Sequence, residues 1–148
     1  MSDLSTLDIL TRLVVAAAIG AAIGLEREYR HKPAGVRTDV LVAIGTCVMT
    51  IVSLQIAQFS GSVEAVDVSR IVSQILPGIG FIGAGTIIQA RGHVEGLTTA
   101  ASIWLVAGVS MAVGLGFFSL AATAAALGIT SLLLLHAVRV PEDDRPRK

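Results

Sequence analysis

Long blocks of apolar residues alternate with short polar segments along this chain. A helix needs roughly 20 mostly apolar residues to cross a bilayer, and five blocks are about that long. We therefore predict five membrane-spanning helices, at about Leu7–Leu25, Val40–Phe59, Ile71–Ile88, Leu97–Leu115 and Phe117–Val138. The fourth and fifth predicted spans nearly touch at Gly114-Leu115-Gly116, which predicts a tight helical hairpin.

These blocks predict an all-α membrane protein, a compact bundle of five transmembrane helices. Residues 1–138 form the bundle, and residues 139–148 form a short polar tail. Hydrophobic residues make up 53% of the chain and charged residues 15%, against about 25% charge in soluble domains. The formal net charge is zero, so we expect the lipid bilayer, and no nucleic acid, as a partner. The single cysteine, Cys47, excludes an internal disulfide and argues against a cysteine-based metal site.

The positions of Lys and Arg predict how the bundle is oriented. Nine of them fall on one side of the predicted spans and one, Arg70, falls on the other. Short cytoplasmic loops are rich in these residues, so we expect the N-terminus outside and the C-terminus in the cytoplasm of a bacterial inner membrane. The first residues, MSDLSTLD, lack the basic start of a secretory signal, so we expect the first span to be retained.

The segment PGIGFIGAG, residues 77–85, matches the G-x-G-x-x-G pattern of a dinucleotide-binding turn. That turn follows a buried strand, opens a helix and precedes an acidic residue about 20 positions later. Here both flanks are apolar over the length of a span, which favours helix packing in a membrane. At about 100° per residue, Gly78 and Gly85 share one face, and Gly80 and Gly83 lie nearly opposite. We therefore expect this helix at the centre of the bundle.

Two further features concern this packing. Span one carries Gly20-x-x-x-Gly24, and small residues let membrane helices approach closely, so we expect span one to pack on span three. Pro77 and Gly78 could also break or kink span three near its middle. Such a break serves either tight packing alone or a site beside it.

Polar residues gather at the predicted cytoplasmic ends of spans one, two and four. We expect Glu26, Arg37, Asp39, Glu95 and Thr99 to converge there, as a structural salt-bridge lock or as a binding site. The candidate functional cluster also includes three residues with simpler interpretations: Arg12, Thr38 and Thr98.

Each of those three residues has a specific interpretation. Thr38 could cap the second span, and Thr98 shares a helical face with Glu95. Arg12, inside the first span, either pairs with Asp8 at the interface or faces inward and marks a pocket.

The candidate chemistry of this cluster is limited. Mg²⁺ prefers oxygen ligands, which Asp39 and Glu95 could supply, but the nearby arginines would neutralise both carboxylates. The histidines show no metal-ligand spacing, and no nucleophile lies beside a base. We therefore expect no enzyme, no cofactor and no firm metal site.

Three blocks of this sequence resemble the MgtC/SapB family of membrane proteins. They are RLVVAAAIGAAIGLERE from Arg12, AGVRTDVLVAIG from Ala34 and GIGFIGAGTIIQARGHVEGLTTAASIW from Gly78. The resemblance implies five spans in a bacterial inner membrane, magnesium homeostasis and, in pathogens, a link to virulence. It also implies control of another membrane machine, with the F-type ATP synthase as a candidate partner. Many members carry a soluble C-terminal domain, which this sequence lacks, so we expect a short form.

Three functions from different classes remain open. The first is a regulatory protein, linked to magnesium limitation or stress, that docks on other membrane proteins. The second is a transporter or channel for Mg²⁺, another divalent cation or a small solute. The third is a structural homo-oligomer held together by Gly20-x-x-x-Gly24.

Overall fold

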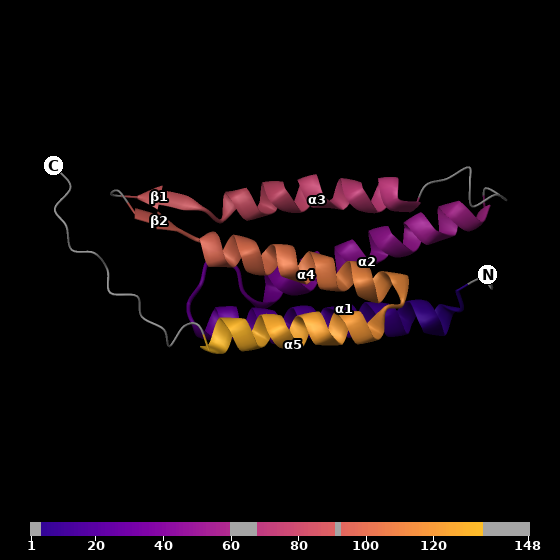
Figure 1. Ribbon diagram of the computed structural model, residues 1–148, viewed down its shortest axis with the longest axis horizontal. Coiled ribbons are helices and arrows are strands. Elements are labelled where there is room, and N and C mark those ends of the chain that lie inside the picture. Colours follow the sequence, from indigo (N-terminus) through magenta and orange to yellow (C-terminus); the bar gives the residue numbers. More distant parts are fainter. Residues whose placement is uncertain (1–3, 60–67, 91–92, 135–148) are drawn as a thin grey trace.

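The computed structural model describes residues 4–59, 68–90 and 93–134 of the 148-residue chain. This part of the chain is helical apart from one small hairpin (Figure 1). The elements, in chain order, are α1 (Thr6–Tyr29), α2 (Val36–Phe59), α3 (Val68–Gly85), β1 (Ile88–Ala90), β2 (His93–Glu95), α4 (Leu97–Leu115) and α5 (Phe118–Leu134). The predicted all-helical class is therefore confirmed.

Three of the helices are long and apolar enough to cross a membrane: Thr6–Tyr29, Val36–Gln58 and Leu97–Leu115. The apolar parts of α3 and α5, Val72–Gly85 and Phe118–Leu134, are shorter. The number of five spans and the orientation of the termini therefore stay predictions. The predicted end of the fifth span, residues 135–138, and the tail, 139–148, lie outside the described residues.

Helix α4 lies at the centre of the bundle. It contacts α1, α2, α3 and α5, and Figure 1 shows α3 along one side of it and α1 and α5 along the other. Its β-branched side chains Ile103, Val106 and Val113 are completely buried. Our prediction that span three is the central helix is wrong. The glycines of α3 provide little side chain to bury, whereas α4 fills the interior with small and β-branched groups.

Helices α1 and α2 approach each other closely at two glycines of α1. A Cβ atom on Gly20 would lie 2.7 Å from the carbonyl oxygen of Asp39, and one on Gly24 would lie 2.6 Å from the Cα of Val36. Both distances are shorter than a Cβ tolerates, so only glycine fits. The expectation that these glycines pack on span three, or hold a dimer together, does not agree with this arrangement, because α2 of the same chain occupies their face.

The segment from α3 to α4 contains the hairpin, which the sequence analysis missed. Helix α3 continues through Pro77 and ends at Gly85, three residues before the predicted end. Strands β1 and β2 then pair antiparallel, with Ile88 opposite Glu95. Gly96 joins the hairpin to α4 with a φ of +90°, and a Cβ there would lie 1.9 Å from the carbonyl oxygen of Thr86. Both the backbone angle and the space require glycine.

Candidate functional site

Arg27 is a basic residue buried among the polar groups of the bundle. It lies near the end of α1 and is only 3% exposed. Its Nη2 donates to Thr99 Oγ1 of α4 at 3.4 Å, and its Nη1 lies 3.4 Å from Glu26 Oε2. Arg27 therefore connects α1 to the start of the central helix.

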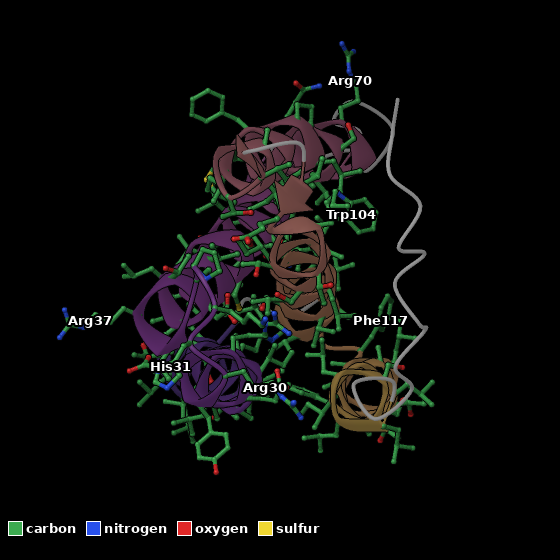
Figure 2. The ribbon with its side chains drawn as sticks, turned by 90° about the vertical axis from the view of Figure 1, so that its left-hand side faces the viewer. Arg30, His31, Arg37, Arg70, Trp104 and Phe117 are labelled. Atoms are coloured by element: carbon green, nitrogen blue, oxygen red, sulfur yellow. The ribbon has the colours of Figure 1, made fainter. Side chains whose placement is uncertain are left out.

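Glu26 is shared by two arginines. Besides Arg27, it pairs with Arg30 one helical turn later. Figure 2 shows Arg30 pointing from α1 toward α5. Two guanidinium groups thus share one carboxylate, Glu26.

Asp39 is fully buried on the first turn of α2. Neither of its carboxylate oxygens has a hydrogen-bond partner among the described residues, and Arg27 is the cation whose charge acts on it. A buried carboxylate without hydrogen bonds is costly. The hydrogen-bonding capacity of the Asp39 carboxylate is therefore left unused by the described residues.

The start of α2 is capped by a residue that the sequence analysis did not select. Glu28 Oε2 accepts a hydrogen bond from the backbone N–H of Val36 at 3.0 Å. Since α2 begins at Val36, Thr38 lies inside the helix and is not the cap that we expected. Arg37 is exposed and points outward from α2, away from Arg30 (Figure 2). It therefore does not join the buried cluster.

A cavity of about 830 Å³ opens beside Arg27. We call it the Arg27 cavity; it is lined by Arg27, Arg30, His31, Lys32, Pro33, Val94, Glu95, Gly96, Leu97, Thr98, Thr99, Ser131 and Leu132. The end of α1, the start of α4 and the end of α5 meet here. Glu95, Thr98 and Thr99, all predicted members of the cluster, line it, whereas Glu26 and Asp39 do not. The cluster is thus divided between a buried part and a cavity wall.

Arg12 lies near the other end of α1. It is 15 residues from Arg27, which is about 22 Å along a helix. Its Nη1 donates to the carbonyl oxygen of Gly114 at 2.5 Å, near the end of α4, where carbonyl groups lack helical partners. Asp8 instead forms a capping box with Ser5. Arg12 therefore holds α1 to α4 and does not belong to the cluster.

Metal binding by Asp39 and Glu95 gains no support from their surroundings. Glu95 is exposed at the end of β2, whereas Asp39 is completely buried in α2. Among the described residues, no group of three His, Cys, Asp or Glu side chains could hold a metal ion.

Helix α3 turns most of its glycines away from the bundle. Cβ atoms added to Gly78, Gly80 or Gly85 would meet nothing within 4 Å, whereas one on Gly83 would contact Ala100 of α4 at 3.6 Å. Phe81, between these glycines, is 83% exposed. We call Gly78, Phe81 and Gly85, which lie within about 60° of one another around the helix, the outer face of α3. On such a face the glycines leave the helix backbone uncovered, and the ring of Phe81 projects beside them.

Sequence reasoning missed Arg27, although a signal was present. Gly20, Gly24 and Arg27 recur at intervals of four and three, which places them on one helical face. Because both glycines pack against α2, Arg27 must face inward as well.

The amino-acid sequence is similar to those of known membrane-protein relatives. The model of the MgtC family matches residues 13–140. The chain is 44% identical to Protein SapB of Bacillus subtilis over 75% of the chain and 49% of that protein. It is 39% identical to the putative magnesium transporter YhiD of Escherichia coli, over 88% of the chain and 62% of that protein. It is 41% identical to Protein MgtC of Salmonella typhimurium, over 88% of the chain and 54% of that protein. The chain thus spans about half to three fifths of the length of these relatives, and no solved structure matches it.

Proposed function

Because this chain belongs to the MgtC family, we propose that it is a magnesium-linked regulatory protein of the bacterial inner membrane that docks on other membrane proteins. The name of the relative YhiD, a putative magnesium transporter, connects that protein with magnesium. The five described helices leave no room for a soluble domain between them. Regulation by this part of the chain therefore operates through contacts within the membrane.

The observation that carries this proposal is the outer face of α3. Gly78 and Gly85 have open space above them, and Phe81 projects beside them on the same face. In membranes, small residues allow a second helix to approach closely. The glycines of α1, in contrast, are already occupied by α2, and α2 and α4 each offer one open glycine among the described residues. Helix α3 therefore offers the largest glycine surface for docking.

A photo-cross-linking residue at position 81, in the full chain in its native membrane, tests the proposal. We expect an adduct with a foreign membrane protein, identified by mass spectrometry; subunits of the F-type ATP synthase are the first candidates to examine. The same residue at Leu10, which is also exposed but lies on α1, should give no such adduct. Adducts with itself alone would support the homo-oligomer, and equal adducts from both positions would count against docking through α3.

A pair of substitutions makes the test more specific. Gly78→Leu fills the outer face of α3, whereas Gly108→Leu on α4 adds the same side chain where a Cβ likewise meets nothing within 4 Å. We expect Gly78→Leu to abolish the foreign adduct and Gly108→Leu to preserve it. Loss of the adduct in both variants would mean that added bulk, and not the α3 face, is responsible.

Transport of Mg²⁺ is the second candidate, and the buried carboxylate of Asp39 favours it. Asp39 is unsatisfied by hydrogen bonds among the described residues, as expected of a group that meets a cation transiently. The charge of Arg27 beside it works against cation entry. Measuring Mg²⁺ flux into liposomes, with Asp39→Asn as the comparison, separates the candidates, because flux that depends on Asp39 would favour transport over regulation.

A further inference from the structure

We propose that the Arg27 cavity binds a phosphate group, carried either by a free phosphate or by a phosphomonoester lipid headgroup. Three basic side chains, Arg27, Arg30 and Lys32, line the cavity together with the carboxylate of Glu95. Its volume of about 830 Å³ lies within the usual range of small-molecule sites. Glu26 pairs with both arginines behind the wall, so three basic side chains stand against two acidic ones, and the remaining positive charge favours an anion over a metal cation. This inference stands apart from docking through α3.

The buried guanidinium of Arg27 supplies the first argument. Its Nε is enclosed by protein and is not a donor to the cavity, but the contacts of its two terminal nitrogens, with Glu26 and Thr99, are both 3.4 Å long. Protein hydrogen bonds of this kind are usually shorter than 3.2 Å. A guanidinium group presents five donors in a plane and matches the oxygens of phosphate. Arg27 therefore retains donor capacity at the wall of the cavity.

The start of α4 supplies the second argument. This 19-residue helix begins after Gly96, which has no side chain to cap it. The first N–H groups of a helix lack partners within it and carry partial positive charge, which makes the position suitable for phosphate. Gly96, Leu97, Thr98 and Thr99 all line the cavity, so the helix end and Arg27 face the same space.

The outer part of the cavity adds further positive charge. Lys32 follows α1 and is exposed, and no ion pair involves it among the described residues. Arg30 shares Glu26 with Arg27. The exposed apolar residues Val94 and Leu97 flank this opening, which is compatible with a lipid chain as well as with water. A free phosphate and a phosphomonoester lipid would thus present the same phosphate group to the cavity, and only the lipid would also carry acyl chains.

Binding is tested with the purified full chain and two probes at fixed ionic strength. Inorganic phosphate is titrated calorimetrically in detergent, and phosphatidic acid is measured by native mass spectrometry in phosphatidylcholine nanodiscs. Binding of inorganic phosphate supports a free ligand, and retention of phosphatidic acid alone supports a lipid headgroup. Failure of both probes to bind the folded protein would overturn the proposal.

Paired variants show whether binding is located in the cavity. The double variant Arg30→Gln/Lys32→Gln removes two cavity cations, and Arg37→Gln/Arg70→Gln removes two cations that point away from the bundle (Figure 2). Both change the net charge equally. We expect roughly tenfold or greater weakening in the cavity variant, as for lost charge-assisted hydrogen bonds, and less than about twofold in the other. Equal weakening in both would reduce the effect to general electrostatic attraction and would refute the site.

Discussion

Replacing Gly24 with alanine tests the close contact between α1 and α2. The added Cβ would lie 2.6 Å from the Cα and 2.9 Å from the backbone nitrogen of Val36. Both are backbone atoms, so no flexible side chain can move aside to make room. The two helices must separate, which moves the buried carboxylate of Asp39 on α2 away from the charge of Arg27 on α1.

The magnitude follows from this geometry. Overpacking a closely packed interior by one or two carbons costs about 1–3 kcal/mol, and the backbone position of the clash favours the upper part of that range. Helix propensity acts in the opposite direction, since alanine is favoured over glycine by about 1 kcal/mol. We therefore expect Gly24→Ala to lower the free energy of unfolding by a net 1–2 kcal/mol, approximately.

Gly45→Ala is the matched control for this prediction. It is the same substitution on α2, at a position where a Cβ meets nothing within 4 Å, so stability should be unchanged or rise by up to about 1 kcal/mol. Unfolding in mixed micelles, followed by circular dichroism with increasing denaturing detergent, measures both variants. If Gly24→Ala unfolds at the same detergent fraction as Gly45→Ala, the close contact between α1 and α2 is not present.

Three further predictions concern other parts of the bundle. Arg12→Gln removes the charged donor to the carbonyl near the end of α4 and should cost about 1.5–3 kcal/mol of stability, measured in the same unfolding assay; an unchanged transition would mean that this bond contributes nothing. Gly96→Ala meets a carbonyl oxygen at 1.9 Å in a left-handed backbone and should destabilise the chain by more than about 1 kcal/mol, whereas wild-type stability would contradict the hairpin geometry. Single cysteines at Lys148 and Ser62, in a Cys47→Ser background, should be labelled from opposite sides of the membrane if there are five spans, and labelling from one side would exclude that number.

The helices were predictable because apolar length determines them. The predicted range of the fourth span, Leu97–Leu115, is the range of α4. The turn to α5 lies at Gly116 and Phe117, slightly after the predicted Gly114-Leu115-Gly116, because Gly114 and Leu115 are still helical. The other helices agree with their predicted spans to within a few residues where the structure describes them. Hydropathy measures how apolar a segment is, and that quantity is sufficient to locate a helix.

The neighbours of each helix were not predictable in the same way. Gly78 and Gly85 were expected to face other helices, but a row of glycines has the same pattern whether it is buried or lines an outer face. The cluster was divided for a similar reason, since Arg37 and Asp39 are close in sequence but lie on opposite sides of α2, one exposed and one buried. Arg27 lies near the end of the first span, which suggested an exposed position. Its place on the same helical face as Gly20 and Gly24 is the better guide, because that face is buried.

The central position of α4 has a consequence for biosynthesis. Because α4 follows α1, α2 and α3 in the chain, these helices are synthesised before the helix that packs against all of them. Until α4 arrives, Arg27 lacks its contact with Thr99, and the part of α2 that packs on α4 is uncovered. The nascent chain therefore passes through an incomplete bundle. A chain arrested after α3 should be degraded rapidly, whereas one arrested after α4 should accumulate.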